Sequence, residues 1–363
     1  MVFHLTASSI PIVIVFFIYG SIHLHHAFSL RRTTEEEVLL FINPSTFYNE
    51  VLASSLFFAS GILWPFIYSL TSATPTGMEF LYMLSTILLL AISLLWWMQG
   101  IYNYFRCRKN TAEMEKRQEE ERKICEYYCS EFELTIQVDL KRKALHLLPG
   151  FVIILIQVLS FIIQPSGFYE AMQIDRESFG IFGEVVVAYA FVFMLGYADL
   201  LRLKAFYQLP NWAKRWFFSS ITREEVKSFI SSCPLVLTLT PFLFAPFPIF
   251  ISVAFVSSLS DAAANLVGRK YGKHKFPKGS KKSIEGYIAG VTSSFLLVVM
   301  FFSVLPPELF NYKAIPPIGV ISIASMASFI FFMIDLFSSG VSDNILNPLL
   351  TGAGMVVVYL LFN

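Results

Sequence analysis

The stretch that decides the fold is SDAAANLVGRKYGKHKFPKGSKKSIEG, residues 260–286, a basic loop between two apolar runs. Seven lysines and arginines lie between Arg269 and Lys282, although the formal net charge of the 363-residue chain is only +1. Each flanking run has about 20 mostly apolar residues, the length that an α-helix needs to cross ~30 Å of hydrocarbon. The pattern predicts a membrane hairpin whose turn carries the positive charge.

The composition extends this prediction to the whole chain. Hydrophobic residues make up 55% of the sequence and charged residues only 15%, with a mean hydropathy of +0.62, which excludes a soluble globular domain. We therefore predict an all-α, polytopic integral membrane protein with about ten transmembrane helices. The expected spans are residues 8–28, 48–70, 79–105, 144–164, 181–202, 228–245, 247–267, 284–305, 316–338 and 343–362.

A charged segment divides the chain into three expected parts. Residues 106–143 mix ten bases with nine acids, which favours a helix-rich cytoplasmic connector with i, i+4 charge pairs. An N-terminal membrane region of three helices, residues 1–105, precedes the connector. A membrane domain of about seven helices, residues 144–363, follows it, and the chemistry is expected there.

The distribution of basic residues predicts the orientation in the membrane. The loops at 29–47, 106–143, 202–227 and 269–282 hold 25 of the 27 lysines and arginines. Cytoplasmic loops of membrane proteins carry an excess of Lys and Arg. We therefore expect the N-terminus outside and these four loops in the cytoplasm.

Ionisable side chains near the ends of spans are the best indication of chemistry, because a charge in the membrane is costly without a partner or a polar cavity. Singly, each is more often a helix-end group that reaches water. On the expected topology, however, six of them lie at one membrane face, which favours a shared site. They are His146, Asp199, Asp261, Glu285, Asp335 and Asp343.

The basic loop has the composition of a phosphate site. Its three glycines, at 268, 272 and 279, allow a close approach of backbone amides to an anion, and its cations offer charge and donors to phosphate oxygens. It is not a P-loop, because the glycine spacing differs and no strand precedes it. The alternative is a plain basic loop attracted to anionic lipid.

Five blocks, in order, resemble the polyprenol kinase family, which groups CTP-dependent dolichol kinases, phytol kinases and the yeast-type diacylglycerol kinase. The blocks are KRKALH (141–146), ADLLRL (198–203), SDAAANLVGRKYG (260–272), KKSIEG (281–286) and SDNILNPLL (342–350). The resemblance covers about residues 140–363. The long C-terminal signature of phosphatidate cytidylyltransferases is missing.

The resemblance implies a lipid-alcohol kinase that uses CTP and Mg²⁺ or another divalent cation, and location within the chain suggests residue roles as a hypothesis. The expected catalytic residues are Asp261, Asp199 and His146, where Asp261 coordinates the metal or accepts the hydroxyl proton and Asp199 supports the metal. The expected metal ligands are Asp261 and Asp343. The expected nucleotide-binding residues are Asn265, Gly268, Arg269, Lys270, Gly272, Lys281, Lys282, Arg142 and Lys143.

The expected partners are a nucleoside triphosphate and a membrane lipid alcohol, with no nucleic acid. A polyprenol such as dolichol is favoured over diacylglycerol, and diacylglycerol over phytol. The active site is expected to face the cytoplasm, in the endoplasmic reticulum of a eukaryote or the cell membrane of a prokaryote. A transporter or a non-enzymatic scaffold is the alternative of another class, and a saturable nucleotide site discriminates between these and an enzyme.

Overall fold

The computed structural model describes residues 6–34, 36–130, 132, 136–280, 282–337 and 340–363. These residues are mostly helical and contain no strand; the only β-type pairing among them is an isolated bridge between Lys275 and Ser283. Nine of their helical segments are long and apolar enough to cross a membrane, which confirms an all-α polytopic membrane protein. These are Ala7–Arg32, Thr46–Ser69, Pro75–Lys109, Arg142–Ser166, Arg176–Lys204, Phe247–Tyr271, Ile284–Val304, Pro317–Phe337 and Asp343–Phe362.

One of the ten expected spans, residues 228–245, is not a continuous helix. It contains the six-residue helix α11 (Ser232–Leu237) and a 3₁₀ turn, Thr240–Phe244. Prolines at 234 and 241 remove backbone donors in this stretch, Pro246 follows directly after it, and apolar composition alone does not register that interruption. The span count from sequence is therefore one too high among the described residues.

By packing, the chain forms two compact units. The first unit contains Met1–Arg142 and Ile163–Leu237, and the second contains Lys143–Ile162 and Thr238–Asn363. This division differs from the three parts expected from sequence, because the helix over residues 176–204 packs with the N-terminal helices. The expected functional division stays a prediction.

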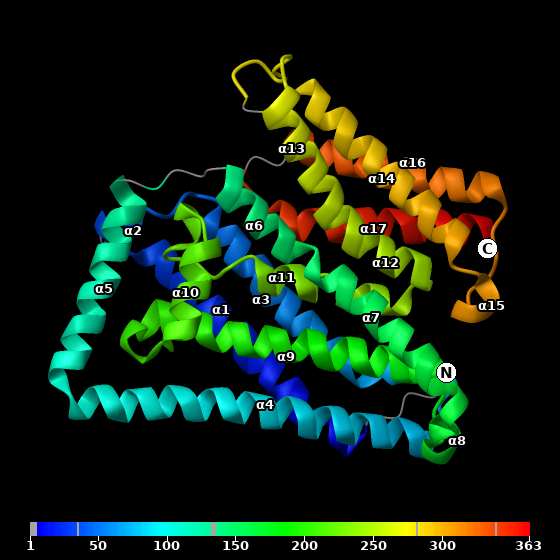
Figure 1. The fold of residues 1–363 in the computed structure, drawn as a ribbon, viewed down its shortest axis with the longest axis horizontal. Helices are drawn as coiled ribbons and strands as arrows, with labels where there is room; N and C mark the ends of the chain where they lie inside the picture. The colour runs from blue at the N-terminus through cyan, green and yellow to red at the C-terminus, as the bar shows by residue number, and fades with distance from the viewer. Residues whose placement is uncertain (1–5, 35, 131, 133–135, 281, 338–339) are drawn as a thin grey trace. The chain divides into compact units, whose positions relative to one another are not determined.

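In the first unit, α1 lies along α3 and α4 lies along α9 (Figure 1). Its core is aromatic: the Phe16 ring packs edge-on against Tyr189 and Phe193, and the Tyr19 ring stacks on Phe57 and Phe193. The helices of this unit are α1 (Ile10–Arg32), α2 (Glu36–Leu39), α3 (Thr46–Leu63), α4 (Pro75–Lys109), α5 (Thr111–Ser130), most of α6 (Ile136–His146), α8 (Phe168–Met172), α9 (Arg176–Lys204), α10 (Asn211–Ser220) and α11.

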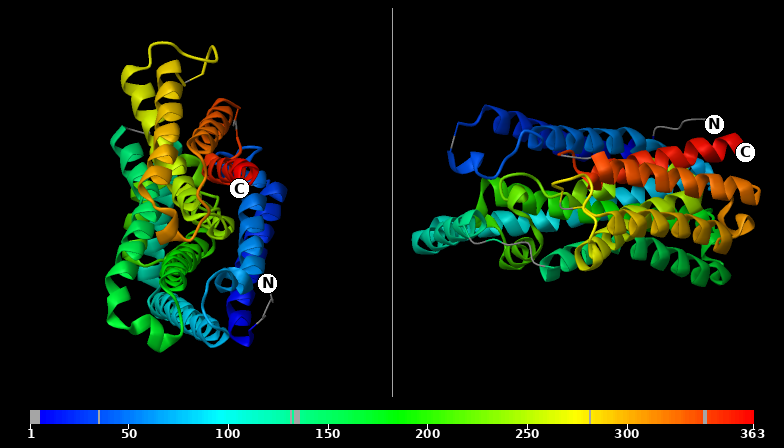
Figure 2. Two further views of the ribbon diagram at one scale, coloured as in Figure 1. Left: turned by 90° about the vertical axis from the view of Figure 1, so that its right-hand side faces the viewer. Right: turned by 90° about the horizontal axis from the view of Figure 1, so that it is seen from above.

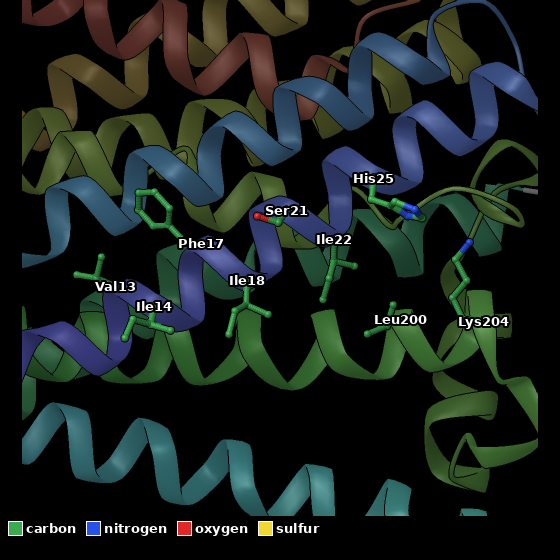
Figure 3. A pocket seen from close by; sticks show the side chains of 9 residues that line it. All are labelled: Val13, Ile14, Phe17, Ile18, Ser21, Ile22, His25, Leu200 and Lys204. Atoms are coloured by element: carbon green, nitrogen blue, oxygen red, sulfur yellow. The ribbon is translucent and has the colours of Figure 1, made fainter.

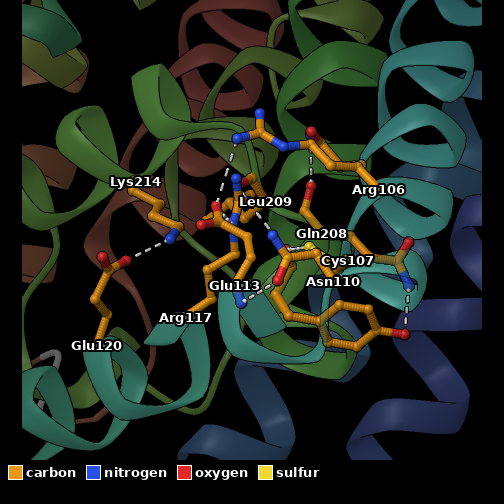
Figure 4. Close-up of polar contacts among 11 residues, drawn as sticks. Arg106, Cys107, Asn110, Glu113, Arg117, Glu120, Gln208, Leu209 and Lys214 are labelled. Carbon is orange, nitrogen blue, oxygen red and sulfur yellow. Dashed lines mark hydrogen bonds and ion pairs between the residues drawn. The ribbon is translucent and has the colours of Figure 1, made fainter. Parts of the chain in front are cut away.

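The connector is helical, as expected, and is clamped to the segment after α9 (Figure 4). The buried Arg117 donates to the carbonyl oxygens of Tyr207 and Leu209, at 3.0 and 3.2 Å. It also forms an i, i+4 pair with Glu113, and Lys214 reaches Glu120 at 2.6 Å. The charges of α5 therefore attach it to the segment that follows α9 and to α10.

In the second unit, α14 packs against both α13 and α16, and α16 runs beside α17 in both views of Figure 2. Its apolar core is built from buried side chains of α12, α14, α16 and α17, including Phe250, Val298, Phe331 and Met355. The helices of this unit are most of α7 (Leu148–Ile163), α12 (Phe247–Phe255), α13 (Asp261–Tyr271), α14 (Ile284–Val304), α15 (Pro307–Phe310), α16 (Pro317–Phe337) and α17 (Asp343–Phe362).

Small residues allow α13 and α14 to approach closely. A Cβ atom on Gly286 would lie 2.7 Å from the carbonyl oxygen of Ala264, and one on Gly290 would lie 3.0 Å from the Cβ of Ala264. Small residues spaced four apart are a common basis of close helix packing in membranes. This contact fixes α13, and the loop that follows it, against the start of α14.

Candidate functional site

The candidate site residues of the second unit lie at the end where the basic loop joins two of its helices. The loop connects α13, which ends at Tyr271, to α14, which begins at Ile284. Lys282, at the end of this loop, pairs with Asp335 near the end of α16, at 2.7 Å. The carboxylates of α13 and α16 and the basic loop thus belong to one end of this unit.

A π-helical turn, Val256–Ser260, separates α12 from α13 and places Asp261 at the start of α13. Buried serines stabilise the turn: the hydroxyls of Ser257 and Ser258 donate to the carbonyl oxygen of Ala254, at 3.1 and 2.7 Å. Such turns shift the register of a helix and are frequent at functional sites. The local sequence SSLSD supplies the small polar side chains that this geometry uses.

Lys143 and Asp261 form an ion pair across 118 positions of sequence. The Lys143 side chain is 6% exposed and the Asp261 side chain 26% exposed, so the lysine is almost fully withdrawn from solvent while the carboxylate stays accessible. A buried ammonium group needs such a partner, because isolated burial of a charge is expensive. The two residues form the centre of the candidate site.

Two acceptors beside Asp261 have no protein partner among the described residues. They are the Oδ1 atom of Asn265, one turn further along α13, and the Oγ atom of Ser260, and both are buried. Buried polar atoms are rarely left without a partner, so each such atom suggests a ligand, an ion or a water. With the Asp261 carboxylate, they form a set of hard oxygen donors.

This donor set fits a magnesium ion that arrives with a nucleotide. Mg²⁺ is usually held by one or two carboxylates together with substrate phosphates and waters. Among the described residues, no group of three or more His, Cys, Asp or Glu side chains is arranged to hold a metal. Asp343, which begins α17 and is exposed, stays a predicted second ligand.

The basic loop is ordered by its own hydrogen bonds and by contacts with α14. Glu285 accepts from the His274 ring at 2.7 Å and from the His274 backbone, and the Ser283 hydroxyl caps α14 at the amide of Gly286. The Tyr287 hydroxyl donates to the carbonyl of Phe276 at 3.2 Å. The loop is therefore a built structure with five exposed cations on it and on the last turn of α13: Arg269, Lys270, Lys273, Lys275 and Lys278.

The expected nucleotide-binding residues have different positions in this site. Arg269 and Lys270 are exposed at the end of α13, with the Lys270 ammonium 5.2 Å from the centre of the Tyr271 ring. Lys282 is committed to Asp335, and Lys281 lies outside the described residues. His146, the last residue of α6, is buried.

Gly268 and Gly272 have a packing role that was not predicted from the sequence. Gly268 lies inside α13, so its amide belongs to the helix, and its Cα faces Gly286 of α14. A Cβ on Gly272 would lie 2.4 Å from the Ser283 hydroxyl. Close packing of helix and loop therefore explains why these two positions are glycine, and their expected part in binding a nucleotide stays a prediction.

Asp199 and Arg142 belong to the first unit, where both have structural contacts. Asp199 is 1% exposed; one carboxylate oxygen accepts from Arg202 Nε at 2.6 Å and the other from the amide of Ile230 at 2.7 Å. Arg142 pairs with Asp139 at 3.2 Å. We therefore leave Asp199 out of the proposed catalytic set, and the roles expected for both residues stay predictions.

Three side chains that make polar contacts or belong to the candidate site were not identified from the sequence. Glu50 is a buried acid in α3 that accepts from the amide of Phe229 and lies 3.4 Å from His23. Ser260 and His274 were missed as members of the site. The serine-rich run before Asp261 was the available signal for Ser260.

The fold and this polar end define a polytopic membrane protein with an accessible carboxylate at the start of α13, an ion-paired lysine and an ordered basic loop. The chain matches the cytidylyltransferase family over residues 76–342, about three quarters of its length, and belongs to that family, which includes CTP-dependent dolichol and polyprenol kinases and related enzymes. The match begins well before residue 140, so it includes α4 and the connector, and it ends at the start of the block SDNILNPLL. No curated protein and no solved structure matches the chain.

Proposed function

We propose that the protein is a CTP-dependent lipid-alcohol kinase that transfers the γ-phosphate of CTP to a polyprenol such as dolichol. The observation that carries the proposal is the accessible Asp261 carboxylate, paired with Lys143 beside two unpartnered oxygen acceptors, in a chain of the cytidylyltransferase family. A kinase site needs a group that accepts the hydroxyl proton and cations that stabilise the transferred phosphoryl group. The residues at this end supply both.

In the proposed reaction, the lipid hydroxyl oxygen attacks the γ-phosphorus, its proton passes to Asp261, and CDP leaves. Lys143, which pairs with this carboxylate, would stabilise it before the transfer and would donate to a phosphate oxygen once the nucleotide is bound. Arg269 and Lys270 contact the phosphates from the end of α13. A divalent cation, held by Asp261 and Asn265 together with the phosphates, would neutralise charge on the nucleotide.

A second candidate, cytidylyl transfer to a phosphorylated lipid, is favoured by the family to which the chain belongs. In that reaction an acceptor phosphate attacks the α-phosphorus of CTP and pyrophosphate leaves. The two reactions use the same nucleotide and differ in which bond breaks. Diacylglycerol and phytol remain alternative acceptors for the kinase.

The deciding experiment incubates purified protein with CTP labelled separately at the α- and γ-phosphates, with dolichol, diacylglycerol, phytol or phosphatidate. The kinase proposal expects γ-label in the lipid and CDP as the coproduct. Release of pyrophosphate with α-label in the lipid establishes the cytidylyltransferase instead. Absence of any saturable CTP dependence with every acceptor contradicts both and returns the protein to the transporter or scaffold class.

A paired variant tests the nucleotide contact. Arg269→Gln/Lys270→Gln should raise the apparent KM for CTP at least tenfold, because charge-assisted hydrogen bonds to phosphate are lost. The matched control, Arg122→Gln/Lys123→Gln, removes two exposed cations of α5 and should leave the KM unchanged. Equal KM values for the two variants would place the phosphates elsewhere.

A further inference from the structure

An open apolar groove of about 830 Å³ lies in the first unit, lined only by residues of α1 and α9 (Figure 3). Six of the nine lining residues are aliphatic or aromatic. The groove is lined by Val13, Ile14, Phe17, Ile18, Ser21, Ile22, His25, Leu200 and Lys204. This volume is within the range of small-molecule sites in proteins.

The lining side chains of α1 form one stripe. Ile14, Ile18, Ile22 and His25 recur every three or four residues, and in Figure 3 the three isoleucines point from α1 toward α9. The other face of α1 packs inward: the Tyr19 hydroxyl donates to the carbonyl of Phe193. Because α1 and α9 are candidate membrane spans, we expect the open groove to face hydrocarbon.

The groove has the length of one leaflet. Residues 13 to 25 of α1 cover 12 helical steps, or about 18 Å at 1.5 Å per residue. Half of a typical hydrocarbon core is about 15 Å, so one lipid chain lying along the groove would reach from the membrane interior to the interface.

The two titratable side chains of the lining lie at one end of the groove. Figure 3 shows His25 and Lys204 together at the end opposite Val13 and Ile14. Neither side chain forms a hydrogen bond or ion pair with another side chain in the described part of the chain, and no acidic residue lines the groove. Lys204 is the last residue of α9, and His25 lies in the C-terminal half of α1, whose last turn carries Arg31 and Arg32.

We propose that this groove binds one anionic phospholipid, with an acyl chain along α1 and α9 and its phosphate held by Lys204 and His25. An apolar channel that ends in an ammonium group and an imidazole complements a hydrocarbon chain that ends in a phosphate. Basic pockets between membrane helices are known to bind anionic head groups. Because α1 precedes residue 76, one wall of the groove lies outside the range that matches the family.

The headgroup is tested by titrating the purified full-length protein, in neutral detergent, with phosphatidylglycerol or phosphatidylcholine of identical chains and counting bound lipids by native mass spectrometry. The wild type should bind one phosphatidylglycerol more tightly than phosphatidylcholine. Lys204→Gln should weaken phosphatidylglycerol about fivefold and leave phosphatidylcholine unchanged. Lys123→Gln, an exposed cation of α5, should change neither.

Binding of the acyl chain is tested by filling the groove with a larger side chain. Ile18→Trp should reduce binding of both lipids, whereas Phe28→Trp, an exposed position of α1 that does not line the groove, should not. Ile14→Trp, one turn earlier, provides the same test should Ile18→Trp fail to fold. An unchanged preference for phosphatidylglycerol in Lys204→Gln, or equal binding in the Ile18 and Phe28 variants, overturns the proposal. No nucleotide enters these measurements, so they stand or fall independently of the proposed function.

Discussion

At the scale of single residues, the pairing of Lys143 with Asp261 determines how the candidate site is to be tested. Lys143 is buried, so removing its partner leaves an ammonium group without compensation. Breaking a buried ion pair typically costs about 3–5 kcal/mol, whereas removing both charges is often neutral. Loss of activity in an Asp261 variant therefore has two possible origins, instability and lost chemistry.

A double-mutant cycle separates these origins. Asp261→Asn should lower the free energy of unfolding by about 3 kcal/mol, and Lys143→Gln/Asp261→Asn should recover most of that loss. Turnover should stay at least about 100-fold below wild type in both, since the proton acceptor is absent. Thermal unfolding and CTP turnover, measured on the same preparations, check this; activity that returns together with stability would make Asp261 a structural residue.

Glu225, in the segment between α9 and α11, predicts a dependence of stability on pH. Burial tends to raise the pKa of this carboxyl, but the Arg142 guanidinium and the backbone amides of Thr222 and Ser231 hold its pKa below the usual range. A depressed pKa contributes stability above the unfolded value of about 4.3, and that stability is lost as the pH falls through the folded pKa.

The corresponding variant is Glu225→Gln. At neutral pH it should be less stable than wild type by about 1–3 kcal/mol, because the carboxylate no longer accepts from both amides. The difference should shrink as the pH falls from 5 toward 3, which unfolding midpoints recorded over that range will show. A difference that does not depend on pH would mean that the carboxylate is not charged in the folded protein.

At the scale of elements, the crossing of α13 and α14 makes a ranked prediction for two glycines. Alanine in a helix interior gains about 1 kcal/mol over glycine. At Gly268 the new Cβ lies 3.2 Å from the Ser283 hydroxyl and at an ordinary contact distance of 3.5 Å from the Cα of Gly286, so Gly268→Ala should be nearly neutral for stability. At Gly286 it meets the backbone carbonyl of Ala264 at 2.7 Å, so Gly286→Ala should destabilise by about 1–3 kcal/mol. Unfolding midpoints of the two variants that rank in the opposite order would contradict the close packing of these helices.

In the non-helical segment from Val226 to Ser231, charged side chains form hydrogen bonds with the backbone. Arg202 donates to the carbonyls of Val226 and Ser228 at 2.7 and 2.6 Å, while Glu50 and Asp199 accept from the next two amides. These contacts satisfy backbone groups that a helix would otherwise pair internally. They explain how non-helical backbone is tolerated where a span was expected.

At the scale of the whole molecule, the basic loops predict orientation. With 25 of 27 lysines and arginines in four loops, a reporter inserted after Lys282 should be cytoplasmic and one near Asn311 should lie on the opposite side. This orientation requires the interrupted apolar segment Ser232–Phe244 to cross the membrane, because the nine long helices of the described residues alone would put the loop after α13 on the face opposite the loop after α9. Accessibility of single cysteines at these two sites, placed in a variant without native cysteines, measures this directly. Labelling of both sites from the same side would remove the basis for a cytoplasmic active site.

The sequence by itself was sufficient for the class of protein and the region of the site. The length of apolar runs and the charge of the loops between them are both properties of consecutive residues. Nine spans and a helical connector were therefore predicted without tertiary information. The block around Asp261 also indicated the region of the candidate site, because it is a contiguous stretch of sequence that can be recognised without knowledge of the fold. Proline positions in 228–245 were the one local signal that hydropathy did not capture.

Only the tertiary structure decided which charged groups meet. Asp199 and Asp261 look alike in sequence, yet one is enclosed by Arg202 and the amide of Ile230 and the other is accessible beside Lys143, 118 positions away. The uses of Gly268 and Gly286, and the stripe of α1 that lines the groove with α9, were decided in the same way. Partner choice depends on distances between residues remote in sequence, which helix packing sets and which no local pattern encodes.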